Sequence, residues 1–252
     1  MSKSNIGWTD HSLNPYGWAC NPVSPGCANC YAMNHAERLG KVFKRPPEWK
    51  GDTWFWRELG KIADGERVFV NSYSDTFHHK AQPAWIHTIF SGAVQRPGVI
   101  FLVLTKRIVN AHKVADELPW PDNLWLGTSV ENGEYVERID ILRDTPAANR
   151  FISFEPLIGR IGRVDLEGVG WIITGGESGP NRRYFDKRWA SEIVEQAKAL
   201  DIPVMHKQGS AFAPGQDRIL SGRTWDEYPA AWGLDQPDVV TAPEQLSLWE
   251  ES

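Results

Sequence analysis

The sequence of 252 residues lacks the features that mark several classes of protein. No apolar run approaches the roughly 18 residues of a membrane-spanning helix. The first residues, MSKSNIGWTD, contain no apolar signal-peptide segment. The net charge of -5 gives no overall attraction to nucleic acid or to an anionic membrane, although it is compatible with a local basic patch. These absences predict a cytoplasmic protein without a membrane-spanning segment.

Cysteine is also scarce. Cys20, Cys27 and Cys30 are the only cysteines, and they lie within eleven residues. Disulfide bonds are a poor explanation for clustered cysteines in a reducing compartment. The spacing C-x6-C-x2-C favours a metal site, because two residues between ligands let both sulfur atoms reach one centre. Pro25 and Gly26, between the first two cysteines, are typical of an irregular ligand-bearing loop.

Three kinds of site stay open for these thiols, besides the interpretation that they are unrelated buried residues. A structural zinc ion usually has four ligands, so His11 or His35 would have to complete it. A redox C-x2-C pair leaves Cys20 unexplained. An iron–sulfur cube usually takes four cysteines, and three would leave one iron open for catalysis. A helix beginning near Asn29 would direct its first amides toward such an anionic cluster.

The arrangement of apolar segments predicts the fold class. Short apolar runs alternate with amphipathic stretches, which is typical of parallel strands joined by helices. We expect strands within 5–15, 67–75, 98–107, 124–132, 150–157, 170–179 and 202–209. We expect helices over 29–39, 83–94, 107–116, 134–143 and 187–200, with Gly40 ending the first. This pattern favours an α/β partial TIM-like (β/α) barrel over a doubly wound sheet.

The chain divides into two parts by composition. Residues 1–210 carry the strand and helix pattern and are predicted to form the partial barrel with its N-terminal three-cysteine loop. Residues 211–252 are polar and rich in turn-forming residues, which predicts an irregular C-terminal extension or a partly disordered tail.

Polar residues close nearly every expected strand. Asp75, Lys106 and Glu155 each follow an apolar run, and we predict catalytic roles for them; Ser129 and Glu131 end another strand. The carboxyl ends of parallel strands form the site in such folds, so these side chains are expected to share one site. Structural ion pairs are the alternative for each residue alone. The residues expected to wall the site just before the cysteines are Trp8, Asp10, His11 and Asn14.

The segment ITGGESGPNRR is a second dense feature. Gly175 and Gly176 lie at a strand end, where glycine permits close approach of a ligand to the backbone. Glu177 is predicted to bind an amine or a ribose hydroxyl, and the arginine pair at 182–183 a phosphate or carboxylate. Ser178, and Ser129 from the earlier strand, complete the predicted cofactor-binding set. A glycine-rich turn with solvated arginines is the structural alternative.

The motifs together resemble a known family. A three-cysteine loop after the first strand of a partial barrel resembles the radical S-adenosylmethionine (SAM) superfamily. The combination of GWTDHSLNP, the cysteine loop, EPL and GGESG is similar to a phage- and prophage-associated, radical-SAM-like family of unknown function. The cysteine spacing of that superfamily is C-x3-C-x2-C, three residues shorter than here, and its GGE-type motif follows the second strand rather than a late one.

The resemblance implies a mechanism and a set of partners. Cys20, Cys27 and Cys30 would bind a [4Fe-4S] cluster whose open iron chelates SAM, and an electron donor would reduce the cluster. The substrate would be a small molecule or a nucleotide, and nucleic acid is compatible but unsupported by the net charge. The alternative is a zinc-stabilised protein that binds a nucleotide or a partner without radical chemistry.

Overall fold

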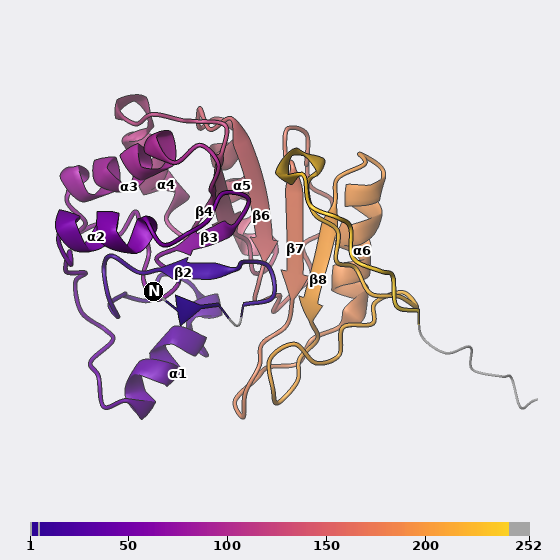
Figure 1. Ribbon diagram of the computed structural model, residues 1–252. Helices are drawn as coiled ribbons and strands as arrows, with labels where there is room; N and C mark the ends of the chain where they lie inside the picture. The colour runs from indigo at the N-terminus through magenta and orange to yellow at the C-terminus, as the bar shows by residue number, and fades with distance from the viewer. Residues whose placement is uncertain (1, 5, 242–252) are drawn as a thin grey trace, which may run out of the picture.

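One eight-stranded sheet organises the protein (Figure 1). The structure is a computed structural model that describes residues 2–4 and 6–241. The strands lie side by side in chain order; the first pair is antiparallel and every later pair is parallel. The strands are β1 (Ser2–Lys3), β2 (His11–Leu13), β3 (Arg67–Val70), β4 (Ile100–Thr105), β5 (Leu124–Ser129), β6 (Asn149–Phe154), β7 (Trp171–Gly175) and β8 (Val204–Gln208).

Helices connect the parallel strands, and all except the first cover the outside of the curled sheet, whereas the first packs in a separate small cluster with Cys20 and Cys30 (Figure 1). They are α1 (Tyr31–Arg38), α2 (Asp52–Leu59), α3 (Pro83–Gln95), α4 (Ile108–Lys113), α5 (Glu137–Arg143) and α6 (Lys187–Lys198). Within the described part of the chain, no helix combines the length and the apolar character needed to cross a membrane.

The strand order identifies the architecture. In a (β/α) barrel each strand lies next to the one that follows it in the chain. In a doubly wound sheet the first strand lies in the middle, and the strand order reverses there. The edge strands β1 and β8 do not pair with each other in the described residues, so the barrel stays open as a half-barrel. The predicted α/β partial barrel is confirmed, and the doubly wound alternative is wrong.

Alternation along each strand separates two cores. Val103 and Ile152 point outward and pack with the helices, whereas their neighbours Leu102 and Phe151 point into the barrel. The reason is that successive side chains of a strand point to opposite faces. Gly127 on β5 has no side chain because the Phe151 ring occupies the space that a Cβ would need, 2.4 Å away.

Most expected elements are present with shifted ends. The helix expected over 29–39 is α1, and Gly40 follows it with φ of 64°, as a glycine ending a helix does. The strand expected within 5–15 is only three residues long. The sequence patterns did not predict α2 or the antiparallel strand β1.

The predicted C-terminal extension is irregular but not separate from the barrel. Trp232 is 7% exposed and packs against Trp125 and Trp171 inside the barrel. The Trp171 Nε1 donates a hydrogen bond to the Glu227 carbonyl at 2.9 Å. The described stretch therefore packs onto the barrel through its aromatic residues. Residues 242–252 of the extension lie outside the described residues.

The role of the extension can be measured. We expect Trp232→Ala to lower the free energy of unfolding by about 3 kcal/mol, because removal of a buried indole leaves a cavity among packed rings. Phe212→Ala is the matched control in the same extension, since Phe212 is 67% exposed and should cost less than about 0.5 kcal/mol. Equal midpoints of urea unfolding for the two variants would contradict this packing role.

Candidate functional site

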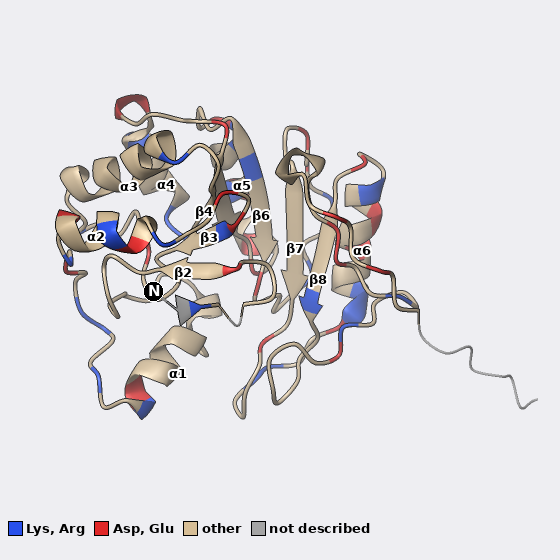
Figure 2. Cartoon of the chain, viewed as in Figure 1, with Lys and Arg blue, Asp and Glu red and all other residues tan. Residues whose placement is uncertain are grey.

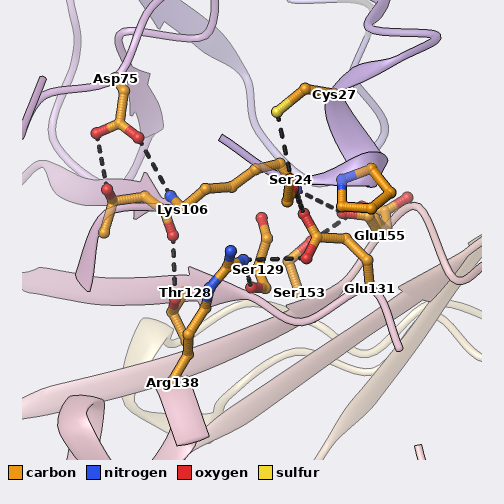
Figure 3. Close-up of polar contacts among 12 residues, drawn as sticks. Ser24, Cys27, Asp75, Lys106, Thr128, Ser129, Glu131, Arg138, Ser153 and Glu155 are labelled. Carbon is orange, nitrogen blue, oxygen red and sulfur yellow. Dashed lines mark hydrogen bonds and ion pairs between the residues drawn. The ribbon is translucent and has the colours of Figure 1, made fainter. Parts of the chain in front are cut away.

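Strand periodicity brings charged side chains into the carboxyl mouth of the half-barrel. Leu102 points into the barrel, and so does Lys106 four residues later at the end of β4. On the next two strands, Glu131 follows the inward-pointing Trp125 by six residues and Glu155 follows the inward-pointing Phe151 by four, so both glutamates are expected on the inner face. Figure 3 shows these side chains converging from three neighbouring strand ends. The prediction that strand-end residues share one place is confirmed for Lys106, Glu131 and Glu155 by contacts among them.

Glu131 is the centre of a buried ion network (Figure 3). Its carboxylate is fully buried, 2.6 Å from Lys106 Nζ and 3.0 Å from Arg138 Nη1 on α5. Burial by itself would raise the pKa of Glu131, but attraction and hydrogen bonding from Lys106, with the Ser24 hydrogen bond and Arg138, lower it below its usual value. The carboxylate is therefore charged at neutral pH. Sequence reasoning placed Glu131 among the strand ends of the shared site but assigned it no catalytic, cofactor-binding or metal-binding role.

The cysteine loop sits directly on this network. Ser24 Oγ donates a 2.6 Å hydrogen bond to Glu131, and Cys27 Sγ lies 3.8 Å from the same hydroxyl. A Cβ on Gly26 would come within 2.5 Å of the Glu131 side chain, so only glycine lets the loop lie this close. The 3-10 turn Pro25–Cys27 thus rests against the end of β5.

Further contacts fasten the first part of the loop. Arg107 Nη2 donates to the Asn21 carbonyl at 2.8 Å, and the Asn21 side chain meets His78 Nε2 at 2.9 Å. The Cys20 amide donates to the Phe43 carbonyl at 3.1 Å. Ser74 Oγ, which follows β3, donates to the carbonyl of the residue before Cys20 at 2.5 Å. The loop is therefore tied to the ends of β3, β4 and β5.

The thiols are close enough to influence one another. Burial raises the pKa of Cys20 to about 12; Asp75 and Cys30 raise it further, while Arg107 opposes them. Burial also raises the pKa of Cys30, against hydrogen bonds from the first amides of α1 and the charge of Lys106; Cys27 raises it further. Cys30 is the N-cap residue of α1, so the amino end of the helix begins at a thiol, and the expectation that its amides face an anionic cluster stays a prediction. Metal binding would have to displace these protons.

The donor chemistry fits a thiolate-bound metal, although the described residues contain no group of three or more His, Cys, Asp or Glu already in ligating positions. Soft sulfur donors suit zinc or iron–sulfur clusters. Cys20 and Cys30 both pack against the small buried cluster of Ala32, Ala36 and Phe43. Arg107 brings positive charge to Cys20, and Lys106 brings it to Cys30. Such charge favours the thiolate form that a metal requires.

The two histidines proposed as a fourth zinc ligand are placed differently. His11 begins β2 and its Nε2 lies 3.0 Å from Glu66 at the opposite, amino end of the strands, so it cannot complete a site with the thiols. His35 on α1 stacks on Trp18, with ring centroids 4.9 Å apart. Of the two, only His35 is near the cysteine loop.

Other residues expected to wall the site also lie at the amino end. Trp8 packs inside the barrel against Phe69, and Asp10 accepts hydrogen bonds from Arg67 at the first residue of β3. That expectation is wrong for both, because they precede the strand whose far end carries the cysteines. Asn14 follows that strand and accepts a hydrogen bond from Ser72 Oγ at 3.1 Å.

Asp75 is buried behind the mouth. Its carboxylate accepts hydrogen bonds from Thr105 Oγ1 at 2.7 Å, Phe77 N at 3.0 Å and Lys106 N at 3.2 Å. Burial raises its pKa against these bonds and the nearby Arg107. The bonds from Thr105 and Lys106 join the end of β3 to that of β4, and Arg107 Nε lies 3.8 Å from the same carboxylate. The predicted catalytic residue is placed here as a support for the Lys106 backbone.

Glu155 lies at the open side of the mouth. Its Oε1 is 3.2 Å from Lys207 Nζ on β8, and its Oε2 is 3.5 Å from Ser153 Oγ. A Cβ on Gly175 would approach Glu155 Oε1 to 2.5 Å, so this glycine makes room for the carboxylate. Ser129 pairs with Ser153 across the strands and is buried.

The GGESG segment, which begins at the last residue of β7, contacts the cysteine loop. Glu177 forms an ion pair with Arg183 and accepts 2.8 Å hydrogen bonds from Asn29 Nδ2 and the Arg183 amide. Arg183 in turn donates to the Pro25 carbonyl at 3.0 Å. The two residues predicted to bind a ligand are therefore paired with each other across the cysteine loop. A Cβ on Gly176 would collide with the backbone at 209–210.

Ser178 continues this edge. It forms an isolated parallel bridge with Ala211, which links the segment to the chain after β8. The structure thus brings the cysteine loop, the 175–183 segment and the ends of β4, β5, β6 and β8 to one mouth.

The fold and the site define a class of protein: an open α/β barrel whose strands carry a three-cysteine loop at their carboxyl ends. Residues 3–229 match the family described as "Protein of unknown function (DUF5131)", so the chain belongs to this family. Among curated proteins, no match to the chain was found.

Proposed function

We propose that the protein is a radical-SAM-like iron–sulfur enzyme. The observation that carries the proposal is the position of three thiols in one loop at the carboxyl mouth of a half-barrel, beside Lys106 and Arg107. A buried mouth of parallel strands is where enzymes of this architecture place their chemistry. The likeness of the chain's motifs to a phage-associated radical-SAM-like family supports the same class.

Cys20, Cys27 and Cys30 would hold the cluster. When bound, a [4Fe-4S] cluster with one open iron supplies one-electron reduction of S-adenosylmethionine, and the resulting radical takes a hydrogen atom from a substrate. Lys106 and Arg107 stabilise the thiolates that ligation needs. Glu131 fixes the loop through Ser24 so that the ligands keep their places.

The remaining charged residues of the mouth are suited to binding. Glu155 and Lys207 form a pair at its open side, and a polar substrate or the amino-acid part of SAM could exchange with it. A small molecule or a nucleotide fits this donor and acceptor set. The proposal also requires an electron donor and a reducing, cytoplasmic environment, because exposed clusters and free thiols are lost by oxidation.

The test is anaerobic purification followed by metal and sulfide analysis. We expect about four iron and four sulfide per chain, and 5′-deoxyadenosine and methionine after addition of dithionite and SAM. Colourless protein with one zinc and no sulfide would contradict the proposal and favour the zinc-stabilised binding protein. If the purified protein held an iron–sulfur cluster but did not cleave SAM, the proposed cluster would be supported and the proposed radical step would be contradicted.

A further inference from the structure

A strongly basic segment borders the cysteine loop, although the chain as a whole is acidic. Residues 38–50 contain five lysines and arginines and one glutamate, whereas the net charge of the chain is -5. They link α1 to α2, and Figure 2 shows blue along this connection. The basic residues are Arg38, Lys41, Lys44, Arg45 and Lys50.

The middle of this segment is anchored beside the thiols. Phe43 is 7% exposed, packs with Ala32 and Ala36 of α1, and accepts the hydrogen bond from the Cys20 amide. Lys41 and Lys44, two residues before and one after it, are exposed. The anchor therefore holds two outward-pointing lysines immediately next to the proposed cluster loop.

These positive charges are little compensated. Arg45 pairs with Glu48 at 2.9 Å, but no carboxylate among the described residues forms an ion pair with Lys41 or Lys44. Lys41 lies over the Trp18 ring and Lys50 over Trp54. Burial lowers the pKa of Lys50, and the charge of Lys41 lowers it further against Glu58, so the two lysines repel each other. An anion beside them would relieve this repulsion.

An exposed aromatic ring lies between this segment and the mouth. Tyr31 directly follows Cys30 and is 48% exposed, while its hydroxyl is held by a 2.5 Å hydrogen bond to the Ser72 carbonyl. Tyr31, His35 and Arg38 are exposed along one side of α1, whereas Ala32 and Ala36 are buried. This side thus presents a fixed ring near the thiols and a guanidinium at its other end.

We propose that α1 and the 38–50 segment bind single-stranded nucleic acid across the cysteine loop. Phosphates would lie along Lys41, Lys44 and Arg38, and a base would stack on the Tyr31 ring, the combination that single-strand binding surfaces use. The 38–50 segment is irregular and offers no helix or ribbon to enter a major groove. An enzyme that acts on a base needs it outside the duplex. Its role as substrate rests on the function proposed above, but the binding does not.

The test measures binding of the anaerobically purified full chain to labelled oligonucleotides of about 20 nucleotides. We expect single-stranded RNA or DNA to bind more tightly than the duplex. Comparing the affinities for the RNA and the DNA strand shows whether the protein prefers ribose or deoxyribose. The double variant K41A/K44A should bind about tenfold more weakly at low salt, with a salt slope smaller by about 1.4, since two phosphate contacts are lost. Tyr31→Ala should weaken binding by a similar factor, while Tyr31→Phe retains it.

The control removes the same charge elsewhere. Lys113, the last residue of α4, and Arg163, between β6 and β7, are exposed and lie outside α1 and the 38–50 segment, so K113A/R163A should leave the affinity unchanged. Equal loss in both double variants, or binding to anionic phospholipid vesicles without oligonucleotide binding, would overturn the proposal. Iron and sulfide measured on the same preparation separate the two hypotheses: iron without oligonucleotide binding overturns only this one, and binding without iron only the enzyme.

Discussion

Glu131→Gln is expected to lower the free energy of unfolding at neutral pH by about 4 kcal/mol. The side chain keeps its size, but the negative charge between Lys106 and Arg138 disappears. Arg138 is 8% exposed in its side chain, so an uncompensated cation stays buried. The loss should greatly exceed that of a surface pair, and urea unfolding of the full chain measures it.

Glu192→Gln is the matched control, because Glu192 pairs with an exposed arginine, Arg160, at 2.8 Å. Exposed pairs of this kind contribute about 0–1 kcal/mol. If both variants unfolded at the same urea concentration, the buried network would have no special role in stability.

The pH dependence of unfolding gives a second comparison between the wild type and Glu131→Gln. The pKa of Glu131 in the folded state lies below the ordinary value of 4.5, so its contribution is fully present above about pH 4.5 and is lost as the pH falls through the folded pKa. We therefore expect the difference in unfolding free energy between wild type and Glu131→Gln to be constant near neutrality and to shrink below pH 4.5. A difference that grew on acidification would have the wrong sign for a carboxylate with a lowered pKa.

The fold was largely accessible from the sequence because its signals are local. Apolar runs such as that of β4 and helix ends such as Gly40 are set by neighbouring residues. The helix α2 was missed because its eight residues, DTWFWREL, are shorter than the window in which a helical pattern is recognised, although Phe55 and Leu59 lie one turn apart. The packing of Trp232 into the barrel depends on contacts with distant strands, which local turn signals in the extension do not reveal.

The candidate site was accessible only in part. The spacing of the cysteines identified their loop, and the polar residues after apolar runs identified Lys106 and Glu155. Both patterns lie within a few neighbouring residues and can therefore be recognised in the sequence. The hydrogen bond from Ser24 to Glu131 joins residues 107 positions apart, so the residue that fixes the loop could not be chosen from its own neighbourhood. Glu177 and Arg183 were predicted to bind ligand groups as members of one segment, but their mutual pairing depends on the fold.

Cys30→Ala is expected to abolish the cluster, with iron content and visible absorbance falling at least about tenfold. Cys30 is the N-cap residue of α1, directly before the first turn of the helix, and its loss removes one of the three proposed ligands. Cys20→Ala and Cys27→Ala should have the same effect, because a cube with two protein ligands has too few anchors to persist.

Two serine variants separate ligation from positioning. Ser24→Ala keeps every thiol but removes the hydrogen bond to Glu131, so we expect iron content to fall by about half or less and to recover after reconstitution with excess iron and sulfide. Ser191→Ala removes an exposed hydrogen bond to Ser221, remote from the loop, and should leave iron content unchanged. Full iron occupancy in any single cysteine variant would show that the thiol in question is not a ligand, and zinc retained with stoichiometry of one in all of them would exclude a thiolate-bound metal at this loop.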